Sequence, residues 1–187
     1  MSQALAESPI FTEDDYYNLP ENIRAELIDG QFYNMSAPSR IHQEILMELS
    51  GTIRDYIRTK KVPCKIYPAP FAVKLFDRDT TIVEPDITVV CDQNKLTDRG
   101  CSGAPDWVIE IISPSTASHD YIRKLKLYSD AGVREYWIVN PLTQTVLVYF
   151  FEFNDLKVQP YTFQESIKPN IFGKRYKTHR NEKKCMS

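Results

Sequence analysis

The stretch Asp106-Trp-Val-Ile-Glu-Ile-Ile112 is the most informative segment of this chain. It is a short apolar run that predicts a largely buried strand, yet Glu110 lies inside it. A second run of the same kind, Glu84-Pro-Asp-Ile-Thr-Val-Val90, carries Asp86 near its start. Carboxylates rarely enter such places unless something neutralises them. Two converging acids therefore predict a site for a hard cation such as Mg²⁺, which takes oxygen ligands.

The segments around these two runs predict a mixed α/β sandwich. Apolar spacing of the helical type is clearest after Pro38-Ser39, and Asp29-Gly30 is a strong hairpin turn. We expect a helix over 12–19, a hairpin over 24–33, a helix over 38–61, strands over 65–75 and 80–90, a polar loop over 92–105, a strand over 106–112, a helix over 119–131 capped by 113–116, and a closing hairpin over 135–153. Pro68 and Pro70 interrupt the 65–75 strand, which indicates an edge strand or a bent one.

Length and charge indicate one domain with an acidic body. A chain of 187 residues is long enough for one sizeable core. We expect a flexible arm over 1–10, the domain over 11–173 and a disordered basic tail over 174–187. The net charge is -2, and the tail holds six Lys/Arg against one Glu, so the remainder carries about -7. An acidic body argues against DNA binding through a broad basic face.

Cysteine usage and hydropathy indicate an intracellular protein. The four cysteines, Cys64, Cys91, Cys101 and Cys185, include no C-x-x-C pair and no histidine at ligand spacing. We therefore expect no zinc site, and we expect the cysteines to be reduced thiols in the cytoplasm. No apolar run resembles a signal peptide or is long enough to cross a bilayer, so we expect no membrane association.

Each acid also has an ordinary structural interpretation. Glu26, in Ala25-Glu-Leu-Ile28, is on pattern alone better explained as a strand residue that faces solvent. Asp86 fits a turn at the start of a strand as well as it fits a functional site. Glu110 favours function, because Ile109 and Ile111 surround it and buried carboxylates are rarely unpaired.

Two basic residues lie on the predicted helices. His42 shares the apolar face of the 38–61 helix, where a hydrogen-bonded core histidine is the ordinary interpretation. Lys124 belongs to a charged stripe, which is normally a solvated helix face. It gains interest because its helix directly follows the Glu110 strand and because Tyr128 lies one turn further on.

These motifs together resemble those of a known family. They are Glu84-Pro-Asp86, the segment 103–116, Lys124 with Tyr128, the segment 131–141, the hairpin Glu26-Leu-Ile-Asp-Gly30 and His42. The combination resembles the bacterial Uma-two type of restriction endonucleases over most of residues 11–172. The resemblance implies a restriction-endonuclease-like fold of the PD-(D/E)xK superfamily, with a central mixed β-sheet flanked by α-helices.

The resemblance also implies a metal site. Asp86 matches the first acid of the nuclease motif and Glu110 the second, and the carbonyl of Ile111 is an expected third oxygen ligand for Mg²⁺ or Mn²⁺. Ile112 stands where the general motif has its lysine, a departure that the family shares. With two acids close together, we expect at least one carboxyl pKa to be raised.

Three more residues match the family pattern. Lys124 matches a lysine on the following helix, which would stabilise charge on the phosphate or orient a water. Glu26 matches an acid that often completes such sites. His42 would form a hydrogen bond at the rim. The chain departs from relatives after Phe172-Gly173, where they tend to have an apolar segment and this chain has a basic one.

The expected function is a Mg²⁺-dependent endonuclease acting on DNA in the bacterial cytoplasm. Two alternatives stay open: a non-catalytic binding or assembly module with a vestigial site, and a hydrolase of another phosphate ester. A homodimer is expected because the consecutive aromatics of the closing hairpin cannot all point inward, and because duplex cleavage needs two sites or two visits. Those aromatics are Tyr149, Phe150, Phe151 and Phe153.

Overall fold

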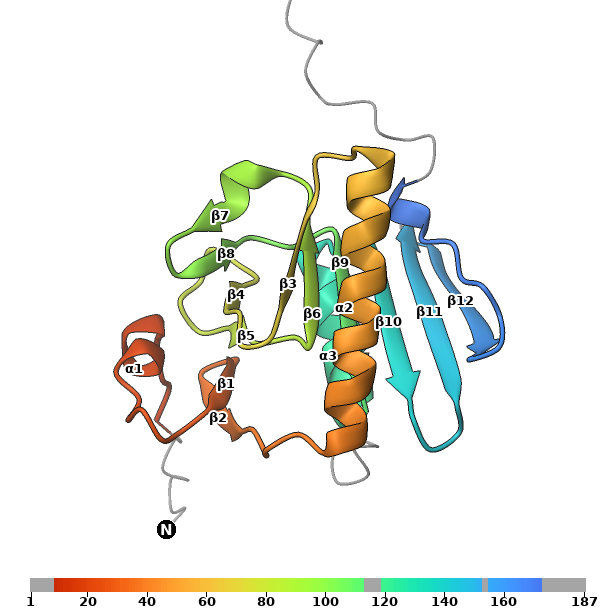
Figure 1. The fold of residues 1–187 in the computed structure, drawn as a ribbon. Helices are drawn as coiled ribbons and strands as arrows, with labels where there is room; N and C mark the ends of the chain where they lie inside the picture. Colours follow the sequence, from red (N-terminus) through yellow and green to blue (C-terminus); the bar gives the residue numbers. More distant parts are fainter. Residues whose placement is uncertain (1–8, 113–118, 153–154, 173–187) are drawn as a thin grey trace, which may run out of the picture.

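Two six-stranded sheets form the framework of the computed structural model, which describes residues 9–112, 119–152 and 155–172 (Figure 1). The main sheet has the order β12-β11-β10-β9-β6-β3. In it β9 and β10 run parallel, and the other neighbours run antiparallel. Its strands are β3 (Lys65–Pro68), β6 (Ile87–Val90), β9 (Trp107–Ile111), β10 (Glu135–Asn140), β11 (Thr145–Glu152) and β12 (Asp155–Thr162).

The small sheet has the order β2-β1-β5-β4-β8-β7. Its hairpin β1–β2 turns at Asp29 and Gly30, which both have positive φ, as a two-residue hairpin turn requires. Its strands are β1 (Ala25–Ile28), β2 (Gln31–Asn34), β4 (Val73–Lys74), β5 (Ile82–Val83), β7 (Leu96–Thr97) and β8 (Gly100–Ser102).

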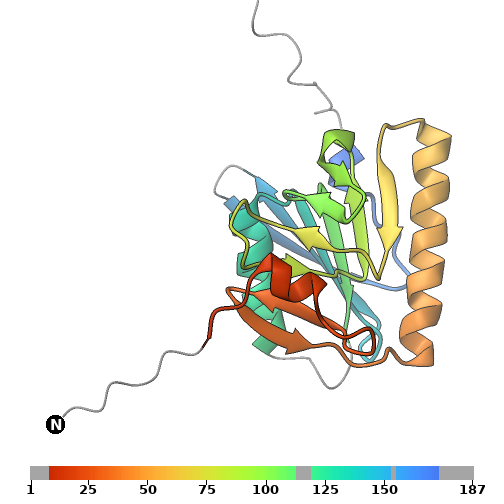
Figure 2. The same ribbon diagram turned by 90° about the vertical axis from the view of Figure 1, so that its left-hand side faces the viewer.

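Helices α2 (Arg40–Lys60) and α3 (His119–Ala131) lie on opposite faces of the main sheet (Figure 2). The Ser39 hydroxyl caps α2 by accepting the His42 N–H, and Lys61 ends it in the left-handed region. The remaining helices are short: α1 (Glu13–Tyr17), η1 (Gln93–Lys95) and η2 (Asn170–Phe172). Over the described ranges, no helix has the length and apolar character needed to cross a membrane.

Alternate residues of β9 pack into two separate hydrophobic cores on the two faces of the main sheet. Trp107, Ile109 and Ile111 pack toward α2, and Val108 packs toward α3 and the small sheet. The two faces follow from the period of two in a strand. Glu110 shares the face of Val108, so its side chain points into the layer between the main sheet, α3 and the small sheet.

The sequence predicted the fold class and most elements correctly, including the three α-helices and the 24–33 hairpin. Two expectations were wrong. The polar loop over 92–105 contains η1 and the β7–β8 hairpin. The strand expected over 80–90 is divided between the two sheets around Pro85. The interruption expected within 65–75 is present: β3 is the edge strand of the main sheet, and β4 belongs to the small sheet. Residues 1–8, the cap at 113–116 and the tail from 173 lie outside the described residues.

Cys64 and Cys91 form a disulfide, which contradicts the expectation of reduced thiols. The pairing follows from strand register. Lys65 on β3 lies opposite Val90 on β6, and the two cysteines are the next residues outward from that pair. The scattered sequence positions of the cysteines gave no sign of this contact. Cys101 is buried and unoxidised.

The aromatic residues of β11 are accommodated on both faces of the main sheet. Phe150 packs against the α2 side, while Tyr149 and Phe151 pack against the α3 side. The argument that these residues require a dimer partner is therefore wrong, because each face offers them a core. Phe153 lies outside the described residues.

Candidate active site

The site begins where β6 and β9 lie side by side. Ile87 is opposite Ile109, so Asp86, one residue before β6, comes level with Glu110. The Asp86 carboxylate turns toward β9, and its Oδ2 accepts the backbone N–H of Ile111 at 2.7 Å. The two acids that the sequence placed on separate runs are thus neighbours across one strand pair.

Lys124 joins Glu110 to the small sheet. Its Nζ donates to Glu110 Oε1 at 3.0 Å and lies 3.0 Å from Glu26 Oε2 and 3.1 Å from Oε1. Lys124 and Glu26 are only 7% and 4% exposed, so neither lies on a solvated face as the pattern alone favoured. The helix α3 and the strand β1 therefore bring a buried cation between two carboxylates.

A second layer of contacts holds Glu26. The backbone N–H of Glu84 donates to Glu26 Oε1 at 3.0 Å. The Glu84 carboxylate in turn accepts the Tyr16 hydroxyl and the Arg24 guanidinium, each at 2.7 Å. Sequence reasoning missed Tyr16 and the role of Glu84. Its position two residues before Asp86 was the one signal that could have drawn attention to it.

Tyr128 lies one helical turn after Lys124 and meets the same carboxylate. Its hydroxyl donates to Glu110 Oε1 at 2.7 Å. Burial and the neighbouring Glu110 charge raise the pKa of Tyr128 well above its ordinary value, so it remains a neutral donor. Glu110 Oε1 is therefore fixed by two donors from α3.

The electrostatics of the site are dominated by burial. Burial raises the pKa of Glu110 to about 7, and the Asp86 and Glu26 charges add to the rise, while Lys124 and the Tyr128 hydrogen bond oppose it. The expected rise is confirmed in direction. Its largest cause is loss of solvent rather than repulsion between the two acids.

His42 reaches Asp86 from the first turn of α2. Its Nε2 lies 3.1 Å from Asp86 Oδ2, and this hydrogen bond raises the pKa of His42 above its ordinary value. The Ile111 carbonyl also favours the protonated ring. His42 is both a buried histidine on the apolar face of its helix and a neighbour of the acids.

The oxygen atoms of the two acids divide into bound and open ones. Within the described ranges, Asp86 Oδ2 and Glu110 Oε1 accept all the hydrogen bonds, and Asp86 Oδ1 and Glu110 Oε2 accept none. Among the side chains that the structure describes, no three His, Cys, Asp or Glu residues are grouped to hold a metal ion. A divalent cation bound through one or two carboxylates plus waters fits the two open oxygens, as Mg²⁺ prefers.

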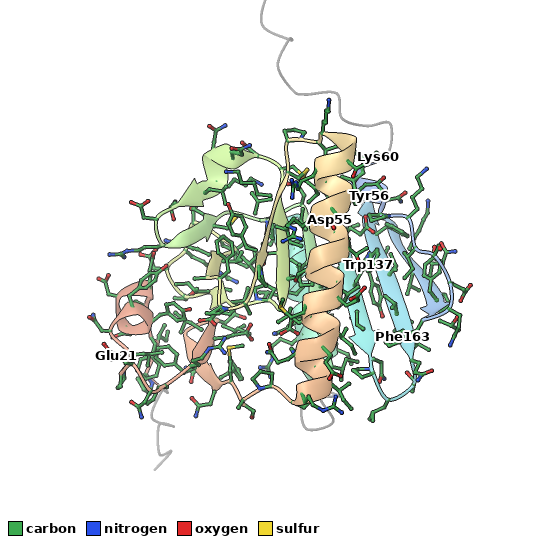
Figure 3. All side chains as sticks on the ribbon, in the orientation of Figure 1. Glu21, Asp55, Tyr56, Lys60, Trp137 and Phe163 are labelled. Atoms are coloured by element: carbon green, nitrogen blue, oxygen red, sulfur yellow. A yellow bond between two sulfur atoms is a disulfide. The ribbon has the colours of Figure 1, made fainter. Side chains whose placement is uncertain are left out.

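A cavity lies elsewhere in the described part of the molecule. It has a volume of about 670 Å³ and lies between α2, the main sheet and residues 162–172. Tyr56, Trp137 and Phe163 line it, with Lys60 at its edge (Figure 3). None of Glu26, Asp86, Glu110 and Lys124 lines this cavity. These four residues, which we call the acidic cluster, are therefore separate from the cavity, whose wall presents mainly apolar side chains.

Known proteins resemble this chain over most of its length. “Uncharacterized protein slr1290” of Synechocystis sp. is 25% identical over 144 residues, which span 75% of this chain and 74% of the relative. A crystal structure from Anabaena variabilis, described as “a putative nuclease belonging to DUF820”, matches with a TM-score of 0.69. That match covers 86% of this chain and 90% of the other at 22% identity, so it establishes the shared fold.

The fold is restriction-endonuclease-like, as the resemblance in the sequence predicted. The family model for Uma2, described as “Putative restriction endonuclease”, matches residues 13–175. This range includes every residue of the acidic cluster, and the match supports a nuclease function. Because it covers most of the chain, the protein belongs to the Uma2 family.

Proposed function

We propose that this protein is a Mg²⁺- or Mn²⁺-dependent endonuclease that hydrolyses DNA phosphodiester bonds. The observation that carries the proposal is the placement of Lys124 between Glu26 and Glu110, beside Asp86. Acids with open oxygens and an adjacent ammonium are the groups that phosphodiester hydrolysis requires. Membership of a family described as “Putative restriction endonuclease” supports the same conclusion.

Asp86 and Glu110 are the proposed cation ligands, through Asp86 Oδ1 and Glu110 Oε2, with the Ile111 carbonyl as the further oxygen that the family pattern suggests. When bound, the cation would polarise a phosphate oxygen and lower the pKa of a water. The protein prepares this position by fixing the other oxygen of each acid. The Ile111 N–H and His42 orient Asp86, and Tyr128 and Lys124 orient Glu110.

Lys124 is proposed to stabilise the charge that develops on the phosphate. Its ammonium is already largely removed from water, so its field is stronger than that of a surface lysine. Glu26 limits where the ammonium can go, because it binds Nζ from the small sheet while Glu110 binds it from the main sheet. Glu84, Tyr16 and Arg24 hold that side in place.

A cleavage assay tests the proposal. Purified protein would be incubated with supercoiled plasmid and with single-stranded DNA, in Mg²⁺, in Mn²⁺ and in EDTA. We expect nicked or linear product with metal and none in EDTA, and loss of product for Glu110→Gln. Undiminished metal-dependent cleavage by Glu110→Gln would contradict the assignment.

A non-catalytic binding module on the same fold is the competing function, and the acidic body of the chain favours it. It would bind DNA or a protein partner without cleaving either. Absence of cleavage by wild type, together with a melting temperature that Mn²⁺ leaves unchanged, would favour this alternative. Release of phosphate from a non-nucleic ester would favour the hydrolase of other phosphate esters.

We also propose a homodimer in the bacterial cytoplasm, where the DNA substrate lies. The support is the outer strand β12, whose Leu156 and Val158 are 53% and 54% exposed. An outer strand has unpaired backbone groups that a second copy could bind. Sedimentation should give twice the mass of 21.7 kDa at micromolar concentration. A monomer at that concentration contradicts the dimer.

A further inference from the structure

Arg123 directly precedes Lys124 on α3, and its guanidinium stacks on a tyrosine instead of pairing with an acid. It lies over the Tyr33 ring at 4.3 Å from the ring centre. In the described part of the chain Arg123 forms no ion pair with a carboxylate, and it is exposed. Five other arginines do pair with carboxylates: Arg24, Arg40, Arg54, Arg78 and Arg134.

Strand register places this stacked pair beside the acidic cluster. Tyr33 on β2 is the direct cross-strand partner of Glu26 on β1, so both side chains lie on the same face of the hairpin. Lys124 contacts Glu26 and Arg123 contacts Tyr33. The two contacts are thus neighbours between α3 and the β1–β2 hairpin. The Lys124–Glu26 contact is buried, and the Arg123–Tyr33 contact is open to solvent.

From this geometry we propose that Arg123, stacked on Tyr33, is a subsite for a backbone phosphate of the bound DNA strand, next to the phosphate that reacts. Stacking holds the planar guanidinium in one orientation and leaves its N–H groups free to bind a phosphate in bidentate fashion. Tyr33 is 37% exposed, so the platform is accessible. Arg123 lies beside the site and outside the ion pairs of the described residues, so in a body of negative charge it is a specific place for an anionic strand.

The chain offers a matched control. Arg99 stacks on the Tyr17 ring at 4.6 Å and also lies outside the ion pairs of the described residues. It belongs to the β7–β8 turn of the small sheet rather than to α3. Arg99→Ala removes the same charge and the same kind of contact, so it measures the general effect of one positive charge on DNA binding.

Binding is measured without cleavage by fluorescence anisotropy, using a labelled single-stranded oligonucleotide and the matching duplex in EDTA. We expect Arg123→Ala to weaken binding of at least one of them about tenfold and to reduce the salt slope by about one. Arg123→Lys should recover part of the loss, and Tyr33→Phe should bind as wild type because it keeps the ring. Arg99→Ala should change affinity less than about twofold.

The inference rests on the proposed function, and a parallel cleavage assay separates the two. If wild type cleaves and Arg123→Ala raises KM with kcat nearly unchanged, both stand. If wild type binds through Arg123 but does not cleave, the subsite stands and the nuclease proposal fails. Three results would overturn the subsite. Arg99→Ala and Arg123→Ala could lose DNA affinity equally, Arg123→Ala could bind DNA as tightly as wild type, or wild type could bind no DNA. Melting curves confirm that the exposed-site variants are folded.

Discussion

Glu110 and Glu135 lie on the neighbouring parallel strands β9 and β10; Glu110 is inside an apolar run, and Glu135 begins one. Glu135 points to the α2 side with Trp137, and it is fully buried. Its Oε1 accepts the Trp137 indole N–H at 2.6 Å, and its Oε2 accepts the backbone N–H groups of Asn170 and Ile171. Glu110 points to the other side, and the described part of the chain supplies donors to its Oε1 alone.

Because these two buried acids differ in their hydrogen-bond partners, burial alone does not identify a functional acid. Burial raises the pKa of both carboxyls, to about 7 for Glu110 and about 6 for Glu135. Both carboxylate oxygens of Glu135 accept hydrogen bonds from the protein, and these bonds fix the short helix η2 to the main sheet. Among the described residues, one oxygen of Glu110 has no hydrogen-bond donor, and it lies beside a second acid and a lysine. The candidate site is distinguished by an acid whose hydrogen-bonding capacity is not fully used and which lies close to other charged side chains.

The largest expected effect is on cleavage. Glu110→Gln should reduce metal-dependent cleavage on the order of 10³-fold, because the open oxygen loses its charge. Glu135→Gln should cleave at a rate close to wild type once it is folded, because it faces the other side of the sheet. The rates are compared on plasmid DNA below the melting temperature of each variant. Equal loss in both variants would erase the distinction between the two acids.

The next effect concerns the stability of the site itself. Lys124→Met removes the cation shared by Glu26 and Glu110 and leaves two buried acids without it. The free energy of unfolding should fall by about 3 kcal/mol, measured by urea denaturation at pH 7.5 in EDTA. Millimolar Mn²⁺ should restore part of that loss by binding the folded state. A loss that Mn²⁺ does not reduce would mean that the acids hold no metal.

The two acids should also differ in how they affect the dependence of the free energy of unfolding on pH. Glu135 has a pKa of about 6 in the folded state against 4.5 for a free glutamate, so the folded protein binds its proton more tightly. Stability from this group is present below pH 4.5 and is lost as pH rises through 6, by about 2 kcal/mol. Glu135→Gln should remove this contribution, so stability should fall less steeply in the variant than in wild type in urea titrations from pH 4.5 to 6. The remaining slope comes from Glu110, whose pKa of about 7 gives a contribution from pH 4.5 to 7, and from the raised pKa of His42 at higher pH. Parallel wild-type and variant curves between pH 4.5 and 6 would contradict this.

The smallest effect is expected from Tyr128→Phe. It removes the hydroxyl that donates to Glu110 and that lowers the pKa of this carboxyl. Stability should fall by about 1 kcal/mol, and the pH at which metal-dependent cleavage is half-maximal should move to higher values. The measurement is cleavage rate against pH for both proteins. A shift to lower pH would show that the hydroxyl does not stabilise the ionised carboxyl.

Local signals in the sequence were sufficient for much of the fold. The cap at Ser39 and the helical spacing identified α2, and Asp29-Gly30 identified the β1–β2 turn. The β7–β8 hairpin was missed because two- and three-residue strands in a polar segment carry too little pattern. The β12 strand was missed although Leu156-Lys-Val-Gln159 alternates between apolar and polar residues, because Pro160 cuts the run short.

The site was only partly predictable, for a different reason. The pair Asp86 and Glu110 could be recognised because acids in apolar runs are unusual. The burial of Glu26 could not be read from its pattern, because all four residues of β1 are buried and the strand has no polar face. The partners Tyr16 and Glu84 meet only through tertiary contacts, and Glu135 looks like Glu110 until its donors from η2 are known.

Calorimetric titration of the folded protein with Mn²⁺ at pH 7.5 tests the central claim most directly, namely that Asp86 and Glu110 bind a metal ion and Glu135 does not. Wild type and Glu135→Gln should bind one Mn²⁺ with similar affinity in the micromolar to millimolar range, and Asp86→Asn should bind none. Absence of binding by wild type at millimolar Mn²⁺, or equal binding by Asp86→Asn, would contradict the account.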